Sequence, residues 1–242
     1  MEKKISFSEI LKKYTMVIVL VLVVIMFAVN TKGVMLLPQN VNNLVAQNAY
    51  VFILATGMLF CILTGGNIDL SVGSVVCFVA AVGGKMMVLN SMNPYLTMLV
   101  MLITGIAIGA WQGFWIAYRR IPPFIVTLAM MNIGRGFARI YTNATTILVN
   151  DELFIWIGSG KIFGEIPVQL LFMVVVVIIT GLILNKTKFG RNIYAVGDNQ
   201  QAAVYSGINS KKVIFLVFTL SGLFAACAGI LSAARTFSGQ FN

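Results

Sequence analysis

The sequence contains no histidine, only 7 acidic residues and 3 cysteines among its 242 residues. Histidine is the commonest metal ligand and a frequent general base, so its absence removes the usual centre of hydrolytic or metal-assisted chemistry. Cys61, Cys77 and Cys227 lie within apolar runs and form no CxxC pattern, which indicates small buried hydrophobic residues rather than disulfides or a metal site. No nucleophile, base or metal cluster is recognisable, so we expect no cofactor and no enzyme activity of the chain itself.

Charge of either sign is also scarce. Charged residues make up 10% of the chain, hydrophobic residues make up 59%, and the mean hydropathy is +0.94. A soluble domain is roughly 45–50% apolar and about 25% charged. The composition therefore excludes an ordinary soluble domain, a disordered chain and a nucleic-acid-binding domain. It predicts an all-α polytopic integral membrane protein.

Apolar segments recur along the whole sequence. A membrane-spanning helix needs roughly 20 residues, and the chain holds about seven such segments in one transmembrane domain over residues 1–242. We read the first, which follows a lysine-rich stretch, as a signal anchor that is retained as a span. The seven predicted spans are residues 15–29, 46–63, 70–89, 94–118, 122–140, 168–184 and 213–234.

The positive charges predict an orientation. The net charge is +10, from 17 Lys and Arg against 7 Asp and Glu, and in membrane proteins cations gather in cytoplasmic loops. If the N-terminus is cytoplasmic, 11 of the 17 cations fall in the inner segments, which are residues 1–14, 64–69, 119–121 and 185–212. The outer loop 141–167 then carries three acids, Asp151, Glu152 and Glu165. We therefore expect a cytoplasmic N-terminus.

Two predicted spans carry small residues at four-residue spacing. The stripes are Gly105, Gly109 and Gly113 in the fourth span, and Ser221, Ala225 and Gly229, flanked by Gly222 and Ala226, in the seventh. Helices in lipid associate through close backbone approach, so the stripes predict packing seams. A face that lines a transport pathway is the alternative.

The polar stretch 185–212 is long for a connection between neighbouring spans. Asp198 can cap a helix with Gln201 as the reciprocal partner, and Gly207 followed by Ile208 is typical of a helix end. This predicts a cytoplasmic helix of about eight residues, whose segment 202–205 offers a small apolar surface. The pattern alone leaves two interpretations open: insertion into a groove of another protein, or packing on the chain's own inner surface.

The stretch 64–73 contains Asp69, an acid close to membrane depth, which makes it a functional candidate. A cap by Asp69 or Ser71 at the start of the third span explains the same residues more simply. Gln112 lies beside the glycine stripe, where a helix-bridging role is favoured over contact with a polar solute. The candidate residues for a translocation path are Asn67, Asp69, Ser71 and Gln112.

Three regions of the sequence, residues 65–73, 108–129 and 189–208, together resemble one family. The run FGRNIYAVGDNQQAAVYSGI, at 189–208, resembles the cytoplasmic signature of bacterial ABC importer permeases for monosaccharides such as ribose, xylose and galactose. The run GGNIDLSVG, at 65–73, resembles a second hallmark of that family. The runs IGAWQGFWIAY, at 108–118, and IPPFIVTLA, at 121–129, resemble the multiple-sugar and xylose-type members.

This resemblance implies a permease subunit in the bacterial inner membrane with no nucleotide site of its own. It implies a second permease copy as a homodimer, ABC ATPase subunits beneath, a periplasmic or lipid-anchored sugar-binding protein outside, and a monosaccharide substrate. Family members usually have about ten spans, so the chain is expected to be C-terminally truncated. The alternative is an ion-coupled secondary sugar transporter that uses Asp69. The residues implied to couple to the ATPase are Gly190, Arg191, Ala195, Gly197, Asp198, Asn199, Ala202, Ala203, Ser206 and Gly207.

Overall fold

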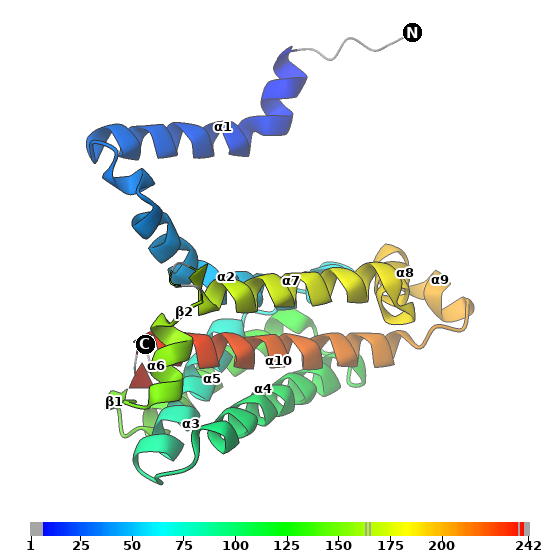
Figure 1. Cartoon of the computed structure of the whole chain (residues 1–242). Helices are drawn as coiled ribbons and strands as arrows, with labels where there is room; N and C mark the ends of the chain where they lie inside the picture. The colour runs from blue at the N-terminus through cyan, green and yellow to red at the C-terminus, as the bar shows by residue number, and fades with distance from the viewer. Residues whose placement is uncertain (1–6, 163, 165, 237, 240–242) are drawn as a thin grey trace. The chain divides into compact units, whose positions relative to one another are not determined.

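The computed structural model describes residues 7–162, 164, 166–236 and 238–239 and is predominantly helical (Figure 1). The chain divides into two compact units, and the boundary in the sequence lies between Val45 and Ala46. The first unit holds α1 (Phe7–Asn30), the 3-10 helix η1 (Val34–Leu36) and the first turns of α2 (Pro38–Ile62). The second unit holds the remainder of α2 and every later element.

The second unit is a helical bundle with a few two-residue strands. After α2 it contains α3 (Val72–Val88), α4 (Pro94–Ala117), α5 (Pro123–Tyr141), β1 (Ile147–Leu148), α6 (Glu152–Ser159), β2 (Lys161–Ile162), β3 (Ile166–Pro167), α7 (Val168–Lys186), α8 (Lys188–Asp198), α9 (Gln200–Tyr205), α10 (Ser210–Thr236) and β4 (Ser238–Gly239). Strand β1 pairs antiparallel with β4, and β2 pairs antiparallel with β3.

Among the described residues, four helices are long and apolar enough to cross a membrane: α2, α4, α7 and α10. Two shorter apolar helices, Tyr14–Asn30 and Val72–Val88, coincide with the first and third predicted spans. Helix α5, which carries Arg135 and Arg139, coincides with the fifth. The all-α polytopic membrane class predicted from composition is confirmed.

Helix α10 is the centre of the bundle and packs on α4, α3 and α6. The glycine stripe of α4 forms the seam: a Cβ added at Gly105 would lie 2.5 Å from Ala226 Cβ, and one at Gly109 would lie 3.0 Å from Gly222 Cα. Gly229 faces α3 instead, where an added Cβ would lie 3.1 Å from Val79 Cγ1. The predicted packing seams are therefore confirmed.

The bundle has two distinct ends, both within the second unit. At one end, which we call the strand end, Lys85 Nζ donates to Tyr141 O at 2.9 Å, and the Asp151 carboxylate caps α6 by accepting from Leu153 N at 3.0 Å. At the other, which we call the loop end, lie the α2–α3 connection, the α4–α5 connection, α8, α9 and the start of α10. Figure 1 shows α8 and α9 at the end of α10 that is remote from α6 and β1.

Candidate functional site

The loop end begins where α7 turns into α8. Thr187 makes this turn, because its hydroxyl donates to Ile183 O at 2.6 Å and accepts from Gly190 N at 3.1 Å. Gly190 is required there, since an added Cβ would meet the carbonyl oxygens of Ile183 and Leu184. Helix α8 then buries Ile193 and exposes its polar side. This 11-residue helix was not predicted from the sequence, although its amphipathic spacing is a signal for it.

The cap of α9 differs from the prediction. Asp198 is the last residue of α8, and the cap is Asn199, whose Oδ1 accepts from Gln201 N and Ala202 N, both at 3.0 Å. Because α8 continues through Asp198, the first extended residue that can cap a new helix is Asn199, with φ −152°. The assignment of the cap to Asp198 was therefore wrong, and α9 has six residues rather than about eight.

The predicted end of α9 is confirmed. Gly207 has φ +83°, its N–H donates to Val204 O at 3.0 Å, and Ile208 N donates to Ala203 O at 3.0 Å. These two bonds form the Schellman motif, which favours glycine at the left-handed position. Helix α9 is thus fixed at both ends by local hydrogen bonds.

The faces of α9 divide sharply. Ala203 is 3% exposed and belongs to the hydrophobic core, whereas Val204 is 53% and Tyr205 is 89% exposed. The ten residues expected to couple to an ATPase divide in the same way. Gly190 and Ala203 are buried, Ala195 and Gly197 are partly buried, and the exposed ones are Arg191, Asp198, Asn199, Ala202, Ser206 and Gly207.

The stretches 65–73 and 189–208, which resemble the permease family, contact each other at Gly197. An added Cβ at Gly197 would meet Leu63 O and would lie 3.3 Å from Gly65 N. Helix α8 therefore rests directly on the backbone that follows α2. Because Gly65 has φ +102°, this connection depends on glycine on both sides of the contact.

Asp69, Ser71 and Gln112 form one buried hydrogen-bond network with Ser221. Asp69 Oδ1 accepts from Ser71 N at 3.0 Å and from Ser71 Oγ at 2.6 Å, and Asp69 Oδ2 accepts from Ser221 Oγ at 2.8 Å. Gln112 Nε2 donates to Ser71 Oγ at 2.8 Å. The network joins the start of α3 to α4 and α10, so Gln112 bridges helices as favoured from the sequence. The role of Ser221 in this network was not predicted from the sequence, because its partner Asp69 is 152 residues away.

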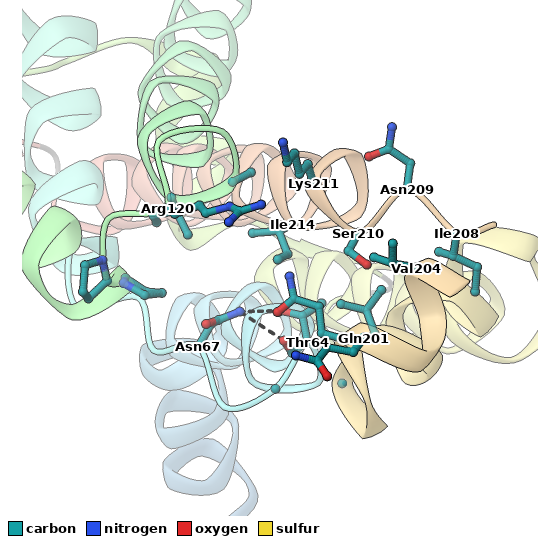
Figure 2. A pocket seen from close by; sticks show the side chains of 18 of the residues that line it. Thr64, Asn67, Arg120, Gln201, Val204, Ile208, Asn209, Ser210, Lys211 and Ile214 are labelled. Atoms are coloured by element: carbon teal, nitrogen blue, oxygen red, sulfur yellow. Dashed lines mark hydrogen bonds between the residues drawn. The ribbon is translucent and has the colours of Figure 1, made fainter. Parts of the chain in front are cut away.

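Asn67 lies apart from this network. Its Nδ2 donates to Thr64 O and to Thr64 Oγ1, both at 3.1 Å, and it lines a pocket at the loop end (Figure 2). The pocket has a volume of about 1090 Å³ and lies between the α2–α3 connection, the α4–α5 connection, α9 and the start of α10. Of the four candidate path residues, Asn67 lines this pocket, and the other three hold helices together.

Within the described part of the chain, no three His, Cys, Asp or Glu side chains are grouped so that they could hold a metal ion. The loop end presents an exposed short helix, a polar pocket and cationic side chains.

Residues 40–242 match the family described as branched-chain amino acid transport system / permease component. The chain is 40% identical over 192 residues to the fructose import permease protein FruF of Bifidobacterium longum, which covers 78% of this chain and 53% of that protein. It is 38% identical over 206 residues to the ribose import permease protein RbsC of Escherichia coli, which covers 84% of this chain and 63% of that protein.

A third relative is matched over almost the entire chain. The ribose import permease protein RbsC of Bacillus subtilis is 36% identical over 241 residues, which is 99% of this chain and 74% of that protein. The chain spans less than two thirds of the length of the fructose permease and of the E. coli ribose permease. No solved structure matches. The chain therefore belongs to this family of transport-system permease components, and its resemblance to the monosaccharide group of bacterial ABC importer permeases is confirmed.

Proposed function

We propose that the chain is a membrane-spanning permease component of an ATP-driven importer of monosaccharides. It lies in the bacterial inner membrane with its N-terminus in the cytoplasm. Sugar is the proposed substrate class because the relatives' names specify import of fructose and ribose. The observation that carries the proposal is α9, a short exposed helix fixed at both ends at the loop end of such a permease.

Helix α9 is the proposed contact for the ATPase. An aromatic side chain that is 89% exposed on an ordered helix offers a large apolar anchor for a partner groove, and Tyr205 has this position. Ala203, by contrast, is held in the chain's own core and anchors the helix to it. We therefore assign the ATPase contact to the exposed face formed by Ala202, Val204, Tyr205 and Ser206.

The path from α9 to the spans is short. Four residues, 206–209, separate α9 from α10, and the Schellman bonds at Gly207 keep this link compact. Helix α10 packs on α4 and α3 through close backbone contacts at Gly109, Gly222 and Gly229. A displacement of α9 is therefore transmitted to the most buried helix of the bundle, because close-packed interfaces have little room to absorb it.

Ion coupling through Asp69 is not favoured. Both carboxylate oxygens of Asp69 accept hydrogen bonds from within the chain, and its side chain is 4% exposed. Asp69, Ser71 and Gln112 are assigned to holding α3, α4 and α10 together. The remaining partners of the proposed complex are a second permease copy, a pair of ATPase subunits and a sugar-binding protein on the outer side.

The test is a matched pair of tyrosine substitutions. Tyr205→Glu places a carboxylate in the proposed docking groove. Tyr95→Glu introduces the same charge at the strand end, in the first turn of α4, where a helix N-terminus favours an acid. Both side chains are exposed, at 89% and 68%, so neither change disturbs the core. Each variant is co-expressed with a candidate ABC ATPase subunit and then reconstituted with a candidate sugar-binding protein.

We expect Tyr205→Glu to weaken ATPase retention by about a hundredfold or more, since an unpaired buried charge costs about 3–5 kcal/mol. ATP-driven uptake of ribose or fructose should fall in the same variant. Tyr95→Glu should retain both the ATPase and the uptake of sugar. Retention and uptake that are unchanged in Tyr205→Glu would refute the docking assignment. Uptake that needs an ion gradient and no ATP would refute the importer class.

A further inference from the structure

The polar side chains that line the pocket at the loop end are cations, amides and hydroxyls, with no acid, and apolar residues such as Ile116, Ile121 and Ile214 form the rest of the lining. Arg120 and Lys211 contribute its charged side chains, and the amides come from Asn67, Gln200, Gln201 and Asn209. Figure 2 shows Arg120 and Lys211 from the α4–α5 connection and the start of α10, with Thr64, Asn67 and Gln201 among the residues on the opposite wall. Such a lining favours an anion, because every charged group in it has the same sign.

Ser210 adds an independent observation. It lines the pocket, is 3% exposed, and its Oγ is buried without a hydrogen-bond partner among the described residues. A buried hydroxyl that lacks a partner is unfavourable by about 1–3 kcal/mol. Figure 2 shows Ser210 between Lys211 and Val204, at the start of α10. A bound acceptor oxygen would satisfy this hydroxyl.

The start of α10 also points to an acceptor. Asn209 Oδ1 accepts from Lys212 N at 3.0 Å, so the cap uses the third N–H of the helix. The N–H groups of Ser210 and Lys211 belong to the open first turn, which has no intrahelical acceptor for them. A helix of 27 residues carries a partial positive charge at this end. The N-terminus therefore reinforces the charge of Arg120 and Lys211.

Aromatic side chains on α4 and just after it, the segment that leads to Arg120, favour a position of the pocket at headgroup depth. Trp111 and Tyr118 are exposed on α4 and just after it, and Trp115 lies 5.5 Å from Trp111 between ring centroids. The guanidinium of Arg119 lies 5.9 Å from the ring centroid of Phe114. Exposed tryptophan and tyrosine next to arginine are typical of the membrane–water interface. Basic pockets at this depth bind anionic lipid headgroups.

We propose that this pocket is a binding site for a phosphate group. Arg120 and Lys211 provide the charge, and the hydroxyl of Ser210 with the first turn of α10 provides the directed donors. The phosphate can belong to the headgroup of an anionic lipid or to free inorganic phosphate, and the two sources share this chemistry. The site goes beyond the proposed transport function, but Val204 and Tyr205 line it and also belong to the proposed ATPase contact, so binding is measured on the permease without the ATPase.

The experiment has one arm for each source. Wild-type protein and variants are placed in nanodiscs of phosphatidylcholine with added phosphatidylglycerol, and retained phosphatidylglycerol is measured by native mass spectrometry. Binding of radiolabelled inorganic phosphate is measured by equilibrium dialysis in detergent. The variants are Arg120→Gln with Lys211→Gln, and Ser210→Ala alone. The control is Lys212→Gln, which removes one positive charge, half of the change in the double variant, at a neighbouring exposed residue that does not line the pocket.

We expect the double variant to lower the affinity for the bound anion by about tenfold or more, since it removes two charge-assisted contacts. Ser210→Ala should also weaken binding, and it should not lower thermal stability because its oxygen has no partner to lose. Lys212→Gln should retain wild-type binding. Binding in the lipid arm alone, or in the phosphate arm alone, supports the site and identifies its source. No selective binding in either arm, or an equal loss in Lys212→Gln, would overturn the proposal.

Discussion

A single carboxylate joins three helices of the bundle. Asp69 accepts two hydrogen bonds from Ser71 and one from Ser221, and Ser71 in turn accepts from Gln112. These side chains are buried within the chain, where no water replaces a lost partner, so each bond in the network matters more than it would at a surface. We therefore expect Asp69 to contribute to stability rather than to ion coupling.

Substitution of Asp69 tests this directly. Asp69→Ala removes all three acceptor contacts and should lower the free energy of unfolding by about 3 kcal/mol or more, because it leaves buried donors without acceptors. Asp69→Asn keeps one acceptor oxygen and should lose less. The measurement is the thermal midpoint in detergent for both variants and for Ser221→Ala. Equal midpoints for wild type and Asp69→Ala would contradict the assignment.

Residues with a local role were predictable from the sequence, and those with distant partners were not. Gly207 was identified as the stop of α9 because the signal lies in the residues beside it. The cap was displaced by one residue, to Asn199, because α8 runs through Asp198. The partnership of Asp69 with Ser221 depends on how α3 and α10 pack, and no local pattern encodes it.

Among the helices, α9 depends on the capping residues at its two ends for its stability. A six-residue helix is not stable alone, since the first turn must be ordered before any gain from propagation. Asn199 supplies the acceptor at one end, and Gly207 supplies the left-handed turn at the other. The burial of Ala203 fixes the helix to the bundle.

The cap assignment predicts different outcomes for two neighbouring residues. Asn199→Ala should destabilise α9 locally by about 1 kcal/mol, because two N–H groups lose their acceptor. Asp198→Ala should have little effect on α9. Amide hydrogen exchange of residues 200–206 is the measurement. Faster exchange in Asp198→Ala than in Asn199→Ala would show that Asp198, and not Asn199, caps α9.

The seam between α4 and α10 predicts different outcomes for two glycine substitutions. An added Cβ at Gly109 would meet Phe218 O and would lie 3.1 Å from Gly222 N, so Gly109→Ala should destabilise the bundle by about 1–3 kcal/mol. At Gly181, in α7, an added Cβ meets nothing within 4 Å. Gly181→Ala should therefore be neutral or stabilising by up to about 1 kcal/mol, because alanine favours a helix. Thermal midpoints in detergent that fall equally for both would contradict the seam.

The sequence predicted the spans and the seam better than it predicted the loop end. Long apolar runs and four-residue spacing are strong periodic signals, and each apolar run became a helix of the structure. Helix α8 was missed because its mixture of polar and apolar residues resembles a loop in composition. Its helical spacing, with Ile193 and Val196 both buried, was the available signal.

For the whole molecule, the proposed function requires that the loop end faces the cytoplasmic side of the membrane. The exposed side chains of α7, which include Leu171, Ile178 and Leu182, form an apolar surface that suits lipid. The cations at the loop end, among them Arg119, Arg120, Lys186, Lys188, Lys211 and Lys212, favour the cytoplasmic side. An ATPase can reach α9 only from that side.

Side-specific labelling tests this most directly. In a background that lacks Cys61, Cys77 and Cys227, a single cysteine is introduced by Tyr205→Cys or, as the control, by Tyr95→Cys. An impermeant thiol reagent is then applied to right-side-out and to inside-out membrane vesicles that contain the permease without its ATPase, so that α9 is not covered. We predict that Tyr205→Cys reacts in inside-out vesicles and Tyr95→Cys in right-side-out vesicles. Labelling of Tyr205→Cys from the outer side would contradict the account, because α9 could not then contact an ATPase.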